Sequence, residues 1–204
     1  MCSAEQSPSL SDADRQTLLA LAVASIRHGL EHGQPLTPET STYRPSLTVP
    51  RATFVTLHEE DGKLRGCIGA LEPVRALVQD VAHNAYAAAF EDPRFRPVRA
   101  DELDRIAVEI SILSPAVPMR AESENDLIGQ LRPGVDGLIV AEGPRRGTFL
   151  PSVWESLARP EDFLRHLKHK AGLPADYWSD TLKVWRYTTE SFGSDAPVNP
   201  STGR

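Results

Sequence analysis

Cysteine is scarce in this sequence of 204 residues, and long apolar runs are missing from it. Two cysteines, Cys2 and Cys67, cannot form a disulfide framework, so we expect reduced thiols. No apolar run approaches the roughly 20 residues that a membrane-spanning helix needs. The first residues also lack the basic and apolar regions of a signal peptide. These absences predict a cytoplasmic protein that has no membrane partner.

Positive charge is also in short supply. The chain has 22 lysine and arginine residues against 28 aspartate and glutamate residues, which gives a net charge of −6. A broad nucleic-acid surface needs a basic excess, so we expect no nucleic-acid partner. The glycine-rich phosphate loops, the Gly-x-Ser-x-Gly elbow, the HExxH helix and paired CxxC motifs are all missing as well, which argues against the enzyme classes that they define.

Metal ligands occur only as isolated pairs of histidines. His28 and His32 are four residues apart near the end of a predicted helix, and His166 and His169 are three apart on another. Neither pair has a second group of ligands at a suitable spacing, and helix-end histidines also complement the helix dipole. The sequence therefore predicts no metal ion and no other cofactor.

Helix and strand patterns interleave along the chain without a regular strand–helix period. Helices are expected between Ser11 and Gly33, from Pro73 to Phe90, from Ser123 to Leu131 and from Pro160 onward. Strands are expected at 51–58, 63–71, 107–113, 138–140, 148–150 and 181–189. The Asp61-Gly62 turn and the turn near 143–147 join neighbouring strands into hairpins. Local hairpins favour an α+β fold over a doubly wound parallel sheet.

The chain ends and one short internal repeat complete this organisation. Residues 1–10 are small and polar and are expected to be mobile, and residues 193–204 are expected to form a disordered tail. An Arg-Gly step enters the second strand of each hairpin, at Arg65-Gly66 and at Arg146-Gly147. A duplicated unit of sheet and helix would explain this repeat.

The run Leu64-Arg65-Gly66-Cys67-Ile68-Gly69 is the densest candidate for chemistry. Glycines inside a strand mark a bulge or the close approach of another backbone or a ligand, so Gly66 and Gly69 are candidate substrate-binding positions. The Arg65 guanidinium, two residues from Cys67, would steer an anionic substrate and would lower the pKa of the Cys67 thiol, which favours a nucleophilic thiolate. A buried, inert cysteine is the alternative, since free cysteine is among the most buried residue types.

A nucleophilic cysteine needs a base, and two residues are candidates. His83 lies beside the apolar stripe of the predicted helix, and Glu109 lies on the strand face opposite Val108 and Ile110. Either of them could instead be an ordinary surface residue, His83 could also be a satisfied buried histidine, and a covered Glu109 would need Arg65 or Arg94 as its partner. Arg94 stands in the proline-bounded loop 92–97, which suits either recognition of an anionic substrate or a structural ion pair.

These motifs, in this order, resemble the AMMECR domain family, which in prokaryotes is called AmmeMemoRadiSam system protein A. The resemblance rests on the Leu64–Gly69 run, Asp92-Pro93-Arg94-Phe95, the strand from Glu109, and Pro133-Gly134-Val135-Asp136-Gly137, and it covers residues 13–192. It implies a two-lobed α+β fold of mostly antiparallel sheets with helices packed as two-layer sandwiches. The larger lobe comes from both chain ends, the smaller central lobe covers roughly residues 70–135, and a cleft lies between them.

The resemblance implies partners more clearly than a reaction. Prokaryotic members of the family resemble partners of a Memo-like protein and a radical SAM enzyme. Our leading hypothesis is an enzyme or enzyme subunit that uses Cys67 in the cleft on a small polar or anionic substrate, with His83 or Glu109 moving protons. The alternative is a binding module without catalytic activity, in which the Gly-rich strand is a scaffold and a tryptophan-rich face, formed by Trp154, Trp178 and Trp185, docks a partner.

Overall fold

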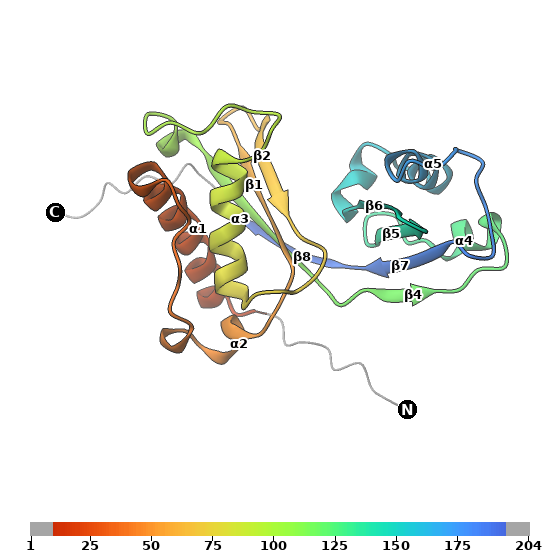
Figure 1. Ribbon diagram of the computed structural model, residues 1–204, viewed down its shortest axis with the longest axis horizontal. Helices are drawn as coiled ribbons and strands as arrows, with labels where there is room; N and C mark the ends of the chain where they lie inside the picture. The colour runs from red at the N-terminus through yellow and green to blue at the C-terminus, as the bar shows by residue number, and fades with distance from the viewer. Residues whose placement is uncertain (1–9, 195–204) are drawn as a thin grey trace. The chain divides into compact units, whose positions relative to one another are not determined.

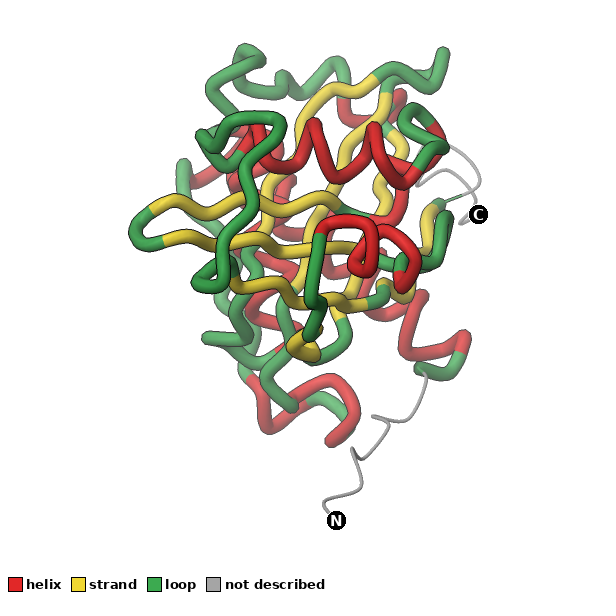
Figure 2. Tube along the Cα trace, turned by 90° about the vertical axis from the view of Figure 1, so that its right-hand side faces the viewer, coloured by secondary structure: helices red, strands yellow, loops and turns green. Residues whose placement is uncertain are grey.

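The computed structural model describes residues 10–194, which fold as two units of helices and antiparallel sheet (Figure 1). The first unit comprises the chain up to Ile112 together with the segment from Glu190, and the second comprises Leu113–Thr189. Both units combine helices and strands, which Figure 2 draws in red and yellow. The expected α+β class is confirmed. None of the helices in residues 10–194 is long and apolar enough to cross a membrane.

The first unit begins with a long helix whose ends follow the sequence signals. Helix α1 (Asp12–His32) starts in a capping box, in which the Ser11 hydroxyl accepts from the Asp14 backbone and the Asp14 carboxylate accepts from the Ser11 backbone. It ends at Gly33, whose φ of 69° lies in the left-handed region that glycine adopts without strain. The following segment, expected to be extended, contains a short 3₁₀ turn (Thr40–Thr42) and a short helix α2 (Pro45–Thr48).

A four-stranded sheet in the order β2-β1-β3-β8 forms the base of the first unit. Its strands are β1 (Thr53–His58), β2 (Leu64–Gly69), β3 (Ala107–Leu113) and β8 (Thr189–Gly193). One face of the sheet, which we call the inner face, carries Val55, Leu57, Val108, Ile110 and Ile112 and is fully covered. Helices α1 and α3 (Leu77–Phe90) pack side by side in the layer that covers it (Figure 1). This is the two-layer arrangement of a half-solvated antiparallel sheet.

A buried polar cluster fixes α3 on β1. The backbone N–H and the hydroxyl of Thr53 both donate to the Asp80 carboxylate, at 3.0 and 2.7 Å. The Asn84 amide, one helical turn further along, donates to the same carboxylate and to the carbonyl and hydroxyl of Thr53. Burial raises the pKa of Asp80, although the two hydrogen bonds from Thr53 and the nearby Arg75 act against the rise. Satisfied donors and acceptors make this register specific at little cost, because none of these groups is left unpaired.

The second unit is built on a sheet in the order β4-β7-β5-β6. Its strands are β4 (Val117–Met119), β5 (Gly137–Glu142), β6 (Arg145–Phe149) and β7 (Lys183–Tyr187), and its helices are α4 (Glu124–Gln130) and α5 (Pro160–Lys170). Short 3₁₀ turns at Leu103–Arg105 in the first unit and Pro151–Glu155 in the second complete the elements. The Trp154 ring is buried and stacks on Phe163 of α5 at a centroid distance of 3.8 Å. Trp154 therefore belongs to the core, whereas Trp178 and Trp185 are partly exposed.

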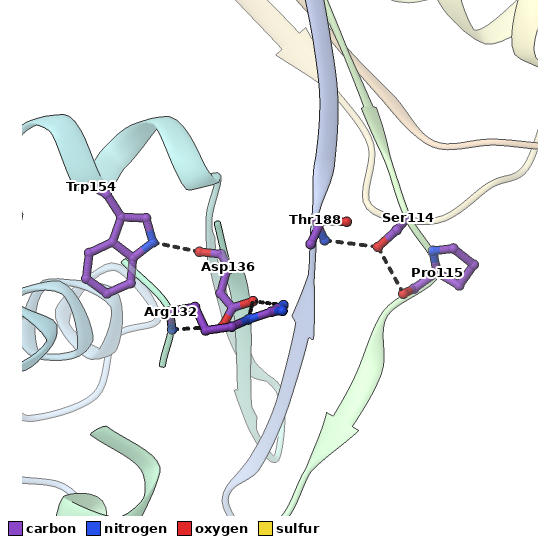
Figure 3. A network of polar contacts seen from close by, with 6 residues as sticks. All are labelled: Ser114, Pro115, Arg132, Asp136, Trp154 and Thr188. Atoms are coloured by element: carbon purple, nitrogen blue, oxygen red, sulfur yellow. Dashed lines mark hydrogen bonds and ion pairs between the residues drawn. The ribbon is translucent and has the colours of Figure 1, made fainter. Parts of the chain in front are cut away.

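Polar contacts hold the entrance of β5 and the two ends of the second unit (Figure 3). The buried Asp136 carboxylate accepts hydrogen bonds from the Arg132 backbone and guanidinium. The backbone carbonyl of Asp136 accepts a hydrogen bond from the Trp154 indole at 2.7 Å. At the ends of the unit, the Thr188 backbone donates to the Ser114 hydroxyl and the Ser114 backbone donates to the Thr188 carbonyl. The chain thus enters and leaves the second unit at neighbouring residues.

Some boundaries differ from the sequence-based expectations. The smaller lobe was expected at roughly 70–135, but the second unit runs from Leu113 to Thr189, because α3 packs on β1 and β2 of the first unit. Helix α3 begins at Leu77, not at Pro73, because Pro50 and Ala76 form a β-bridge just before it. The chain ends were expected to be mobile or disordered at 1–10 and 193–204. Residues 1–9 and 195–204 lie outside the described residues, whereas Leu10 is buried and Gly193 is the last residue of β8.

The Gly66→Ala substitution should destabilise the first unit strongly. A Cβ at Gly66 would clash with the carbonyl oxygen of Ala88 on α3, which is backbone and cannot rotate away. We expect a loss of at least about 2 kcal/mol in the free energy of unfolding measured by urea denaturation. The matched control is Gly129→Ala in α4, where nothing lies within 4 Å of the added methyl group and a gain of up to about 1 kcal/mol is expected. A neutral Gly66→Ala variant would show that α3 does not approach β2 so closely.

Candidate functional site

The second face of the first sheet, which we call the outer face, carries Cys67. Strand pairing places Cys67 opposite Thr56 on β1, and Thr56 opposite Glu109 on β3. Directly opposite residues of antiparallel strands share a face, so these three side chains form one row across three strands. All three are partly exposed, whereas their neighbours Leu57 and Val108 point into the core. Cys67 and Glu109, both predicted as catalytic candidates, thus lie on the same face of the sheet, two strands apart with Thr56 between them.

His58 joins this row through Glu109. Its Nε2 atom lies 3.4 Å from a carboxylate oxygen of Glu109, and its Nδ1 atom lies 3.3 Å from the carbonyl oxygen of Gly62 in the hairpin turn. The His58 side chain is 30 % exposed and the Glu109 side chain 41 % exposed, so both remain in reach of a solute. Arg65 and Arg94 were the partners suggested for a covered Glu109. The carboxylate is not covered, and it lies beside a histidine of the adjacent strand.

The thiol of Cys67 is held in its protonated form. Burial raises the pKa of Cys67, while a hydrogen bond from the Thr56 hydroxyl at 3.3 Å and the positive charge of Arg94 act against the rise without cancelling it. Asp92 and Glu109 add to the rise through their negative charges. The expectation that a neighbouring guanidinium lowers the pKa of this thiol below its ordinary value is wrong, because desolvation is the larger effect.

Asp92 and Arg94 clamp the backbone of Cys67 at the free edge of the sheet. β2 is the outermost strand, and the Cys67 N–H donates to an Asp92 carboxylate oxygen at 2.9 Å. The Arg94 guanidinium donates to the Cys67 carbonyl at 3.4 Å and, in a fork, to both oxygens of Asp92 at 3.0 and 2.7 Å. This fork holds the pKa of Asp92 far below its usual range. Arg94 is therefore first a structural residue, although more than half of its side chain is exposed.

The two glycines of the motif serve close packing inside the protein. A Cβ at Gly66 would meet the backbone of Ala88 on α3, and one at Gly69 would meet the Phe54 ring and the Thr53 carbonyl. At both positions, glycine therefore allows the close approach of another part of the protein and not of a ligand. The structure gives neither glycine an open space in front of it that a substrate would fill.

Arg65 points away from the thiol. Its guanidinium is nearly inaccessible, with 5 % of the side chain exposed, and lies 3.4 Å from Glu102 in the loop that follows α3. The pairing of β1 with β2 slips between Leu57 and His58, so that Arg65 has no partner across the ladder. Residues i and i+2 of a regular strand share a face, but a bulge breaks this relation. In a regular strand, the Arg65 side chain would lie on the same face as Cys67. Because the pairing is irregular at this point, the Arg65 side chain lies beside Glu102 instead.

His83 is also separated from Cys67. It lies on the side of α3 that faces the segment after α1, where it lines a hollow of about 290 Å³ together with Pro35, Arg75 and Gln79. No residue of the outer face lines this hollow. The structure therefore does not bring His83 to the thiol, and His58 is the histidine that shares a face with it.

His58 has a signal of its own in the sequence, outside the motifs. Thr56 and His58 alternate with the apolar Val55 and Leu57 in the strand before the Asp61-Gly62 turn. Given that turn, pairing of the two strands places the polar side of β1 beside Cys67. Among residues 10–194, no group of three or more His, Cys, Asp or Glu side chains is close enough to hold a metal ion.

Comparisons with known proteins assign the family. The profile of the AMMECR1 family matches residues 19–192. A protein from Thermotoga maritima is 41 % identical over 172 residues, covering 84 % of this chain and 94 % of the relative, and one from Methanothermobacter thermautotrophicus is 44 % identical over 151 residues, covering 71 % and 76 %. The crystal structure of an uncharacterised protein from Pyrococcus horikoshii superposes with a TM-score of 0.81 at 35 % identity, covering 89 % of this chain and 91 % of that one. The chain belongs to the AMMECR1 family, and the resemblance noted in its motifs is confirmed.

Asp92→Asn should weaken the protein at neutral pH. The substitution removes the charge that holds Arg94 and one acceptor of the Cys67 N–H, and hydrogen bonds to charged groups contribute about 1.5–3 kcal/mol. We expect a loss of about 2 kcal/mol in urea unfolding at pH 7. Asp101→Asn in the same loop, where the carboxylate is exposed, is the matched control and should change stability by less than about 0.5 kcal/mol.

The effect of Asp92→Asn should depend on pH with a definite sign. The pKa of Asp92 is lower in the folded than in the unfolded protein. The Asp92 carboxylate therefore stabilises the fold fully above its unfolded pKa of about 3.9, and this stabilisation is lost as the pH falls through the lower folded value. The stability difference between wild type and Asp92→Asn should therefore shrink on acidification below about pH 4. A difference that stays constant or grows there would contradict the clamp.

Alkylation of Cys67 should report its raised pKa. In a Cys2→Ser background, we expect the rate of reaction with iodoacetamide to rise with pH through an inflection above that of the same thiol in the urea-unfolded chain. Thr56→Val removes the hydroxyl that donates to the sulfur and should move the inflection further up. An inflection below that of the unfolded chain would mean that the thiol is activated at rest.

Proposed function

We propose that this chain is an enzyme or an enzyme subunit that binds a small polar substrate on the outer face and attacks it with Cys67. The observation that carries the proposal is the gathering on one partly exposed sheet face of a thiol, a hydroxyl, a carboxylate and an imidazole. Cys67, Thr56, Glu109 and His58 come from three strands, so their mutual positions are set by strand register and not by mobile loops.

The raised pKa of Cys67 decides how such an attack would proceed. A protonated thiol has to lose its proton as it attacks, so a base must accept that proton. Glu109 lies one strand away from Thr56 on the same face, and its charge acts on the thiol. His58 lies against Glu109 and has its second ring nitrogen near the Gly62 carbonyl. The pair of His58 and Glu109 is the acid–base group that we assign to this site.

An amide or ester is the substrate class that fits these groups. The sulfur forms a bond to the carbonyl carbon, the thiol proton passes to the His58–Glu109 pair, and the bond from carbon to nitrogen or oxygen breaks. The leaving amine or alcohol takes up that proton, and water then hydrolyses the thioester and restores the thiol. The partly exposed Arg94 guanidinium at the edge of β2 supplies positive charge for an anionic substrate.

The family resemblance suggests partner proteins for this activity. A Memo-like protein and a radical SAM enzyme, both implied by the resemblance, are the partners we propose, and the low cysteine content supports a cytoplasmic location. Co-purification of the full chain with each candidate tests the partnership, and an absence of both complexes at physiological salt would reject it.

A binding module without catalytic activity is the second candidate, and one observation favours it. A thiol whose pKa is raised by burial and that accepts a hydrogen bond from Thr56 is typical of a structural cysteine. In that case Cys67→Ala leaves complex formation and cellular function intact. For an enzyme, the same variant keeps the complexes and loses the cellular function.

Covalent capture is the direct test of the catalytic proposal. Intact-mass spectrometry of the Cys2→Ser chain after incubation with a panel of small amides, esters and thioesters should detect an acyl adduct on Cys67 that Cys67→Ser lacks. General-base catalysis contributes about 10²-fold or more, so Glu109→Gln and His58→Gln should slow adduct formation by at least that factor. Glu91→Gln, an exposed carboxylate at the end of α3, is the matched control. If no acyl donor modifies Cys67, or if Glu109→Gln reacts at the wild-type rate, the proposed mechanism is wrong.

A further inference from the structure

The first unit contains a second polar hollow that the outer face does not include. It has a volume of about 410 Å³ and lies between the β1–β2 turn and the loop that carries the Leu103–Arg105 turn. Arg65, Arg96 and Arg105 line it together with Glu102. Glu59, Glu60 and Asp61 line it from the side of the hairpin, where Asp61 is paired with Lys63. Cys67 does not line this hollow, so an inference about it is independent of the proposed function.

One nitrogen of a buried guanidinium in this hollow lacks a hydrogen-bond partner. Arg65 is 4 % exposed, and its Nη1 atom is buried with no partner among the described residues. Its Nη2 atom lies 3.4 Å from Glu102, but that carboxylate also accepts from Arg96 at 3.0 Å and from the Arg99 backbone at 2.9 Å. One carboxylate thus serves two guanidiniums. Buried polar donors are nearly always paired, and an unpaired one in a cavity points to a missing acceptor.

Charges of both signs remain available around the hollow. The Arg105 guanidinium donates to the Asp101 carbonyl and forms no ion pair with the described side chains. Glu59 and Glu60 are exposed, and neither forms an ion pair within residues 10–194, although Glu59 attracts the nearby Lys63 electrostatically. A simple anion would therefore meet the arginines and be repelled by the two glutamates, while a simple cation would meet the opposite conflict.

We propose that this hollow binds a small zwitterion, with an oxyanion group at Arg65 and Arg96 and an ammonium group at Glu59 and Glu60. A carboxylate supplies the acceptor that the Arg65 Nη1 atom lacks, and a guanidinium can bind it with two parallel hydrogen bonds. The amino group at the other end compensates the glutamates. A zwitterion compensates both the arginines and the glutamates. The hollow should therefore select ligands by the distance between their carboxylate and ammonium groups.

Titration calorimetry with the full chain tests this assignment. The probes are a series of ω-amino acids of increasing length (glycine, 3-aminopropanoate, 4-aminobutanoate and 6-aminohexanoate), with acetate, propylammonium and inorganic phosphate as ligands of one charge sign. We expect one saturable site per chain, a preferred chain length, and at least tenfold weaker binding of each single-sign ligand. The factor corresponds to loss of one charge-assisted contact, about 1.4 kcal/mol.

Variants test whether the binding measured by calorimetry takes place in this hollow. Arg96→Gln should weaken the best amino acid about tenfold, and Glu60→Gln should weaken it without weakening acetate. Arg99→Gln is the matched control, because Arg99 is an exposed arginine of the same loop that does not line the hollow. Both arginine side chains are largely exposed, so neither variant threatens folding as Arg65→Met would.

Three outcomes would overturn the proposal. The first is the absence of saturable binding by every amino acid of the series. The second is binding of acetate or phosphate as tight as that of the best amino acid, which would define a plain anion site. The third is an equal loss in Arg96→Gln and Arg99→Gln, which would place the ligand elsewhere.

Discussion

The carboxylate of Asp92 is the contact on which the first unit's sheet edge depends. It accepts from the Cys67 backbone and from Arg94, so one side chain ties the outermost strand to the loop that follows α3. The same loop carries Glu102, which holds Arg65 and Arg96. The negative charge of Asp92 at the strand edge thus fixes the backbone beside the thiol, and the negative charge of Glu102 holds the two arginines of the polar hollow. Because these contacts are charge-assisted, they tolerate the partial exposure of the loop better than neutral hydrogen bonds would.

Periodicity and capping predicted most of the fold. Ser11 and Gly33 mark the ends of α1 because their side chain and backbone freedom satisfy helix ends locally. The Asp61-Gly62 turn and the alternation from Ala107 to Leu113 depend on similarly short-range geometry. The repeat of Arg-Gly steps also has a structural meaning. Gly66 and Gly147 both lie in the second strand of a hairpin, and each admits the close approach of a helix end, at Ala88 and at Ala171.

The site was predictable only in part, because its chemistry depends on tertiary packing. Glu109 and Cys67 follow from strand alternation, and His58 could have been found in the same way. The displacement of Arg65 could not, since the two glycines of the run indicate either a bulge or a close approach and do not say at which residue a bulge falls. The direction in which His83 points depends on which side of α3 faces the sheet, and the pKa of Cys67 depends on how much protein surrounds the sulfur. Neither quantity is encoded in the spacing of residues.

The pairing of Ser114 with Thr188 bears on how this architecture is assembled along the chain. The second unit begins and ends at residues that are hydrogen-bonded to each other, at 2.8 and 2.9 Å. Just outside it, β3 and β8 run antiparallel, since Ser111 contacts Ser191 and Val108 contacts Ser194. Residues 113–189 therefore have the topology of an insertion into a hairpin. A tight turn in their place would join β3 directly to β8, so the sheet of the first unit needs no central segment to complete it.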